Sequence, residues 1–163
     1  MLILGIDPGY GRLGWGLIDG EKSIAYGCLE TSKNLTEAKR LNQLFDGLTK
    51  LLTKYKPEAV SVESLFFFQN ITTAMKVSQA RGIVLLACEK IGISTYSYAP
   101  LQIKMAVTGY GRADKNQVQQ MTKTILKLDA IPKPDDAADA LAIAITHSFT
   151  HKLKANILKA NDR

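Results

Sequence analysis

The chain has 163 residues, of which 46% are hydrophobic and 22% charged, values that fit one globular domain. No apolar run approaches the ~20 residues needed to cross a bilayer, and the N-terminus lacks the basic leader of a secretory signal. We therefore expect a cytoplasmic protein with no membrane partner. The formal net charge of +6 favours polyanionic partners, with nucleic acid foremost, but says nothing about the fold.

The cysteines and histidines give no support for a zinc site. Cys28 and Cys88 lie far apart in the sequence and form no CxxC pair, so we expect both to be reduced. His147 and His151 are the only histidines. The cysteines therefore do not support a zinc site, and two histidines exclude a His-rich metal site.

The first third of the chain predicts three antiparallel strands. Residues 2–6, 13–18 and 23–31 are rich in apolar residues, and turn signals separate them at Asp7-Pro8-Gly9 and Asp19-Gly20. Such short connections are typical of an antiparallel meander.

Helices and strands alternate in the remainder of the chain. The expected elements are a helix between Thr36 and Pro57, a strand at 58–63, a helix at 70–91, a strand at 93–98, and helices at 101–107, 114–128 and from Asp135 to about Phe149. Gly82 would allow close approach to the helix at 70–91. This order predicts an α/β fold with a five-stranded mixed sheet, in which parallel strands follow the three antiparallel ones and helices flank the sheet.

We expect residues 1–150 to form a single domain and residues 151–163 a basic tail. The tail carries few apolar residues to anchor it, so we expect it to be frayed or mobile. Its basic residues are Lys152, Lys154, Lys159 and Arg163.

Two acids stand at the ends of predicted strands. Asp7 ends the first strand and Glu63 ends the fourth, each after an apolar run. If these strands are neighbours, the two carboxylates meet at one edge of the sheet, where ligand sites of open α/β sheets lie. Taken singly, Asp7 also fits a simple turn, and Glu63 a solvated strand end.

Two further acids share one face of the last helix. Asp136 and Asp139 are three residues apart, and the alanines around them would let that face pack closely on a sheet. A site of four carboxylates would need cations to offset its repulsion, and oxygen ligands favour Mg²⁺, with Mn²⁺ as a substitute. Two such ions can activate water for phosphodiester hydrolysis. Asp135 lies in the same turn, and its presence there is better explained by the favourable interaction of an acid with the positive end of the helix dipole.

Several segments together resemble the RuvC family of crossover junction endodeoxyribonucleases. A single DPG or DAAD is a weak signal, but the ordered set is specific and runs from residue 2 to His147. The matching segments are Ile3-Leu4-Gly5-Ile6-Asp7-Pro8-Gly9, Gly14-Trp15-Gly16, Val62-Glu63-Ser64-Leu65-Phe66, Gln79-Ala80-Arg81-Gly82, Thr108-Gly109-Tyr110-Gly111 with Ala113, Lys115, Gln117 and Val118, and Asp136-Ala137-Ala138-Asp139-Ala140-Leu141-Ala142-Ile143-Ala144.

The resemblance implies an RNase H-like fold and a homodimer that makes paired, Mg²⁺-dependent nicks in a four-way (Holliday) DNA junction. It also implies cooperation with the RuvA–RuvB branch-migration complex. By position, Asp7, Glu63, Asp136 and Asp139 would be the catalytic, metal-binding acids. Phe66 would stack on junction bases. Lys104 and Lys115 match basic positions near the scissile phosphate.

Other residues could also contact DNA. Tyr110 and Arg112 lie in a glycine-containing loop, and Arg12 is close to Asp7 in the sequence. Solvated surface residues are the alternative for each lysine and arginine, and core packing for at least one of the three consecutive phenylalanines. His147 could assist at the metal site, but helix packing explains it better.

The helix at 70–91 is the candidate dimer interface, although burial in the core explains its apolar residues equally well. Those residues are Met75, Val77, Val84, Leu85 and Leu86. Two segments depart from the family pattern, Tyr10-Gly11-Arg12-Leu13 after the DPG turn and the tripled phenylalanine at 66–68. The first departure leaves the local DNA contacts after the turn open, and the second could alter the loop that reads the junction.

Three alternative functions remain open from the sequence. One is another RNase H-like nuclease that acts on RNA or on DNA without junctions. The second is an ATPase-like domain of the sugar-kinase or actin type, which would ordinarily need a second domain. The third is a junction-binding module without catalytic activity.

Overall fold

The computed structural model describes residues 1–64 and 71–161. Within them, five strands form the predicted mixed sheet, and their order is β3-β2-β1-β4-β5. The first three strands pair antiparallel, whereas β4 runs parallel to β1 and β5 parallel to β4. The strands are β1 (Leu2–Asp7), β2 (Arg12–Asp19), β3 (Lys22–Glu30), β4 (Ala59–Glu63) and β5 (Thr95–Tyr98).

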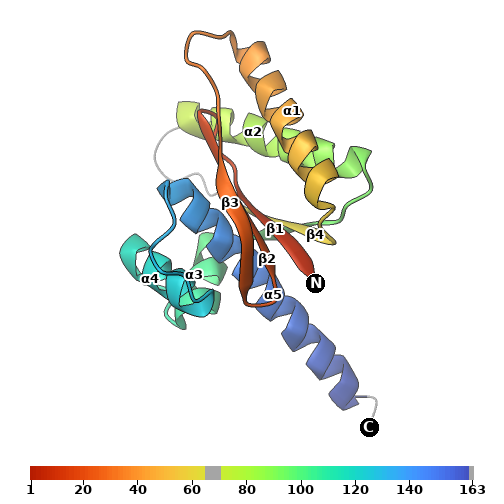
Figure 1. Ribbon diagram of the computed structural model, residues 1–163, viewed down its shortest axis with the longest axis vertical. Helices are drawn as coiled ribbons and strands as arrows, with labels where there is room; N and C mark the ends of the chain where they lie inside the picture. Colours follow the sequence, from red (N-terminus) through yellow and green to blue (C-terminus); the bar gives the residue numbers. More distant parts are fainter. Residues whose placement is uncertain (65–70, 162–163) are drawn as a thin grey trace.

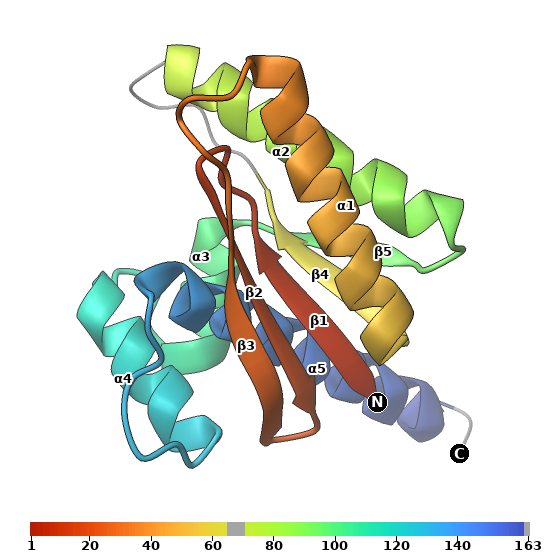
Figure 2. The same cartoon turned by 45° about the horizontal axis from the view of Figure 1, so that its top comes forward.

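Helices cover both faces of the sheet, which gives three layers (Figures 1 and 2). On one face lie α1 (Glu37–Tyr55) and α2 (Ile71–Lys90). On the other face α5 (Asp135–Asn161) crosses the sheet, with α3 (Pro100–Thr108) and α4 (Lys115–Ile125) beside it. None of the described helices combines the length and the apolar character of a membrane span.

The two-residue alternation of β1 places Asp7 on the α5 face. Leu4 and Ile6 are fully buried in the core beneath α1 and α2. Ile3 belongs to the core beneath α5, and Gly5 contacts that helix. Because side chains alternate along a strand, Asp7 points to the same side as Ile3 and Gly5. The register of β1 thus determines which face of the sheet carries the acid.

Glycines let α5 lie directly on the sheet. A Cβ at Gly5 would lie 2.0 Å from the carbonyl oxygen of Ala140, and one at Gly14 would lie 2.0 Å from that of Asp136. Gly14 is also the β2 partner of Asp7 in the register. The predicted close approach through small residues is therefore present, and it brings the first turns of α5 next to the end of β1.

Two sequence expectations were wrong. The last helix does not end near Phe149 but continues to Asn161, because no proline or glycine interrupts residues 150–161, most of which tolerate a helix well. Among residues 1–64 and 71–161, nothing approaches Gly82 closely, since a Cβ there would meet nothing within 4 Å.

Gly14→Ala is expected to destabilise the protein by about 1–3 kcal/mol, because the added methyl group would overlap backbone atoms of Asp136 and push α5 off the sheet. Thermal unfolding followed by circular dichroism measures the effect. Gly47→Ala in α1 is the matched control, since the three atoms nearest to its new Cβ belong to the flexible side chain of Leu29. Equal midpoints for both variants would contradict the close-packing argument.

Candidate active site

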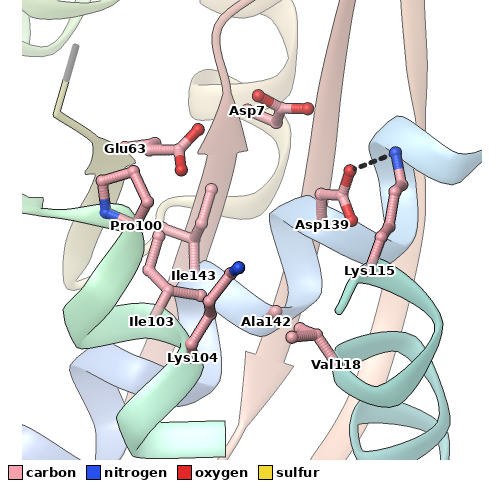
Figure 3. A pocket seen from close by; sticks show the side chains of 10 residues that line it. All are labelled: Asp7, Glu63, Pro100, Ile103, Lys104, Lys115, Val118, Asp139, Ala142 and Ile143. Carbon is pink, nitrogen blue, oxygen red and sulfur yellow. Dashed lines mark ion pairs between the residues drawn. The ribbon is translucent and has the colours of Figure 1, made fainter. Parts of the chain in front are cut away.

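A cavity of about 210 Å³ opens at the carboxyl ends of β1 and β4, between the sheet, α3, α4 and α5 (Figure 3). Acids and lysines project into it over an apolar wall. The lining residues are Asp7, Glu63, Pro100, Ile103, Lys104, Lys115, Val118, Asp139, Ala142 and Ile143.

Parallel pairing of β1 with β4 brings the two strand-end acids together. Ile6 pairs with Val62 in the register, so the next residue on each strand, Asp7 and Glu63, lies at the same edge of the sheet. Asp139, on α5, faces the same cavity (Figure 3). Three carboxylates that are far apart in the sequence therefore share one small volume.

This concentration of negative charge changes the acidity of the carboxyl groups. Burial raises the pKa of Asp7 to about 7, and repulsion from Glu63, Asp139 and Asp136 adds to the effect. Burial also raises the pKa of Glu63, with a contribution from Asp139. The site therefore favours a proton or another cation near Asp7.

Lys115 partly offsets these charges. Its ammonium nitrogen lies 2.9 Å from Oδ2 of Asp139 and 4.0 Å from Oδ2 of Asp135. The bond to Asp139 raises the pKa of Lys115, so the side chain stays charged. Lys104 also lines the cavity (Figure 3). Both lysines predicted to lie near the scissile phosphate are thus beside the acids.

Asp136 lies beside the cavity rather than among its lining residues. Nη1 of Arg12 is 3.5 Å from Oδ2 of Asp136, and Nε of the same arginine is 3.1 Å from Oε1 of Glu30. Arg12, which the sequence offered as a DNA contact, therefore holds two acids at the margin of the site.

The remaining predicted residues lie outside the cavity. Tyr110 and Arg112 are exposed in the loop between α3 and α4 and do not line it. Phe66 falls outside the residues that the structure describes. His147 is buried, and its Nδ1 lies 2.7 Å from the hydroxyl of Tyr98. Burial lowers the pKa of His147 to about 4, so it is a neutral packing residue, as expected.

Sequence reasoning missed the apolar wall of the cavity. Ile103, Val118 and Ile143 come from α3, α4 and α5 and face the acids. One sequence signal could have predicted this wall. Ile103 stands next to Lys104 on α3, and a lysine at the edge of an apolar helix face indicates that apolar residues lie beside it. Apolar walls matter chemically because a low local dielectric strengthens every charge interaction inside.

The donors in the cavity fit a hard divalent cation. They are carboxylate oxygens without His or Cys, the set that Mg²⁺ and Mn²⁺ prefer. Within residues 1–64 and 71–161, no three Asp, Glu, His or Cys side chains are gathered tightly enough to enclose an ion. Asp139 is instead bound by Lys115. The raised pKa values of Asp7 and Glu63 show that added positive charge would stabilise this arrangement.

Comparison with known proteins gives consistent matches. The family model described as crossover junction endodeoxyribonuclease RuvC matches residues 3–147. The protein of that name from Rubrobacter xylanophilus is 50% identical, with 94% of this chain and 88% of the relative covered. The one from Ruminiclostridium cellulolyticum is 48% identical over 100% of this chain and 99% of its own. The structure of Thermus thermophilus RuvC in complex with Holliday junction substrate matches with a TM-score of 0.89, 36% identity, and coverage of 94% and 96%.

The fold and these matches define a phosphodiester hydrolase of the RNase H-like class. The chain belongs to the RuvC family of crossover junction endodeoxyribonucleases. The ATPase-like alternative is thereby set aside.

Asp7→Asn is expected to stabilise the metal-free protein at pH 8 by ~1–4 kcal/mol. Because the pKa of Asp7 rises from 3.8 to about 7 on folding, ionising this carboxyl lowers the stability as the pH rises through that interval. Asparagine carries no charge, so the variant avoids this loss. Thermal unfolding in EDTA at pH 8 and pH 5 measures the gain, which should shrink at pH 5.

Mg²⁺ provides the complementary measurement. It should raise the unfolding midpoint of the wild type more than that of Asp7→Asn, because binding to the native state stabilises it. If the wild type and Asp7→Asn had identical unfolding midpoints in EDTA at pH 8, the charge on Asp7 would not destabilise the folded protein.

Proposed function

We propose that this protein resolves four-way DNA junctions by paired nicks, with Asp7, Glu63, Asp136 and Asp139 as the catalytic acids. The observation that carries the proposal is the convergence of three of these carboxylates and two lysines on one cavity. The match to a RuvC structure described as bound to a Holliday junction supports the choice of substrate. Such an activity serves DNA recombination and repair, and we place it in the cytoplasm.

The four acids would hold Mg²⁺, with two ions per site and Mn²⁺ as a substitute. Bound ions supply the activation of water and the stabilisation of the leaving oxygen. Lys104 and Lys115 neutralise the phosphate that enters the cavity. The apolar wall, which includes Val118, excludes water and strengthens these interactions.

Contacts to the rest of the junction come from residues around the cavity. Phe66 follows shortly after Glu63 in the sequence, and we assign it to base stacking, which is worth about 1–3 kcal/mol per base. Tyr110 and Arg112 are exposed and can reach the phosphate backbone. Arg12, whose side chain is 52% exposed, contacts the backbone while it pairs with Asp136.

Asp7→Asn should abolish nicking while junction binding survives, because the acids perform the chemistry and the basic residues hold the DNA. Nicking is measured with Mg²⁺ on labelled four-way junctions, and binding is measured in EDTA by fluorescence anisotropy. Linear duplex and structured RNA are the comparison substrates for the wild type. Equal cutting of all three would favour a general RNase H-like nuclease, and parallel loss of cutting and binding would contradict the division of roles.

We also propose a homodimer, since one active site makes one cut and junction resolution needs two. An apolar stripe along α2 is the candidate interface. Ile71, Met75 and Leu86 are 79%, 63% and 52% exposed, and Gly82 lies between them on the same helical face. Val84 is buried in the core instead. A Cβ at Gly82 would meet nothing within 4 Å in the described part of the chain, so this position would let a second copy approach closely.

Met75→Glu is expected to convert the dimer into a monomer, because it places a charge in an apolar interface. Sedimentation velocity at micromolar concentration measures the oligomeric state. Met121→Glu is the matched control, since Met121 is an exposed methionine on α4, away from this stripe. An unchanged sedimentation coefficient for Met75→Glu would place the interface elsewhere. Cooperation with the RuvA–RuvB complex is a separate proposal, based on the family resemblance.

A further inference from the structure

A second cationic site lies on the other side of the turn that carries Asp7. Tyr10 stands in the β1–β2 turn, and its ring is contacted by two cations from different helices. The Cζ of Arg40, on α1, lies 4.2 Å from the ring centroid, and the Nζ of Lys76, on α2, lies 5.8 Å from it. Figure 2 shows this turn close to the N-terminal ends of α1 and α2.

The arginine of this cluster is held in place by hydrogen bonds. Nε of Arg40 donates to Oγ1 of Thr31 at 2.9 Å, and Nη2 donates to the carbonyl oxygen of Tyr10 at 3.5 Å. Oγ1 of Thr31 donates to the same carbonyl at 3.0 Å. A guanidinium has five N–H donors, and these bonds use two of them. Donors therefore remain on a group whose position is already fixed, which lowers the entropic cost of binding a ligand.

No carboxylate balances the two cations within residues 1–64 and 71–161, where neither Arg40 nor Lys76 forms an ion pair with an acid. Glu37, in the first turn of α1, accepts a hydrogen bond from Gln79 instead. The first turn of α2 contains no acid either. Two like charges near one ring repel each other, and an anion bound close to both reduces that repulsion.

The cluster differs in this respect from the cations of the active site. There, Lys115 is paired with Asp139 and Arg12 with Asp136. In those pairs the positive charge of the cation offsets the negative charge of a proposed catalytic acid. The charge on Lys76 is exposed and uncompensated, so it is available to a polyanion.

Distance along the chain places the cluster within reach of the cut strand. Tyr10 is three residues beyond Asp7, so their Cα atoms are at most about 10 Å apart. Phosphates of one strand rise about 3.4 Å per nucleotide along a duplex. A DNA arm with its scissile phosphate at Asp7 therefore has further phosphates at the distance of Tyr10.

We propose that Tyr10, Arg40 and Lys76 form a phosphate-binding site for the DNA arm that leaves the active-site cavity. The proposal rests on the junction-resolving function proposed above. The ring of Tyr10 contacts both cations, and the phosphodiester backbone passes beside this cluster within about three nucleotides of the cut.

Lys76→Gln is the test variant, because Lys76 is exposed and its loss leaves the fold intact. Junction binding is measured in EDTA by fluorescence anisotropy over a series of salt concentrations. One lost phosphate contact should weaken binding about 2–5-fold near 0.1 M salt and reduce the slope of log K against log salt by about 1. Tyr10→Ala should have a similar effect and Tyr10→Phe almost none, since phenylalanine keeps the ring.

Lys54→Gln is the matched control. Lys54 also lies over a tyrosine ring, at 4.7 Å from the centroid of Tyr55, but near the C-terminal end of α1. Its 14-residue separation from Arg40 corresponds to about 21 Å along the helix. This variant should bind like the wild type. If Lys76→Gln and Lys54→Gln have the same affinity and the same salt slope, the proposed site does not exist.

Phosphate ethylation interference locates the contact. Ethylation within about three nucleotides of the cut should weaken binding of the wild type but add little to the defect of Lys76→Gln. Interference only at other positions would overturn the placement. A wild-type protein that does not cut junctions would refute the proposed function instead, so the two failures are distinguishable.

Discussion

The contact between α5 and the glycine-lined face of β1 and β2 is the constraint on which the site depends. Where Gly5 and Gly14 stand, a methyl group would overlap backbone carbonyls of α5. The helix axis is therefore nearer to the sheet than larger side chains would permit. This close approach puts Asp139 in the cavity with Asp7. It also brings Asp136 near enough to raise the pKa of Asp7. The small residues of the β1–β2 hairpin thus serve the acids of a helix more than 100 residues away.

Electrostatics explains why the acids can be gathered at all. Folding brings carboxylates together at a cost, and the protein offsets part of it with its own cations. Lys115 lies against Asp139, and Arg12 bridges Glu30 and Asp136. Asp7 lacks such a direct partner among the ion pairs of the described residues, and burial together with repulsion gives it the raised pKa. The least compensated charge is at the centre of the site, where added positive charge has the largest effect.

Local patterns predicted the five strands of the sheet and the acids at the ends of two of them. Apolar runs that end in Asp7 and Glu63 mark strand ends, and three-residue spacing puts Asp136 and Asp139 on one helical face. Interactions between distant segments could not be predicted in this way. Nothing near Arg12 in the sequence indicates its bond to Asp136, because that pair depends on how α5 crosses β2. A lysine-rich, weakly apolar composition also does not distinguish a mobile tail from a helix, and α5 continues beyond Phe149 because no helix-breaking residue follows.

The cations fall into two groups, those paired with the proposed catalytic acids and those available for binding DNA. Lys115 and Arg12 are bound to acids, so a phosphate that reaches them competes with carboxylates already in place. That competition reduces their contribution to affinity, while the ion pairs fix their positions beside the proposed catalytic acids. Arg40 and Lys76 lie against Tyr10 without an acid partner in the described part of the chain, so a phosphate gains the full interaction there. Substrate affinity can therefore come mainly from cations outside the catalytic cavity, which leaves the acids free to be arranged for the reaction rather than for binding.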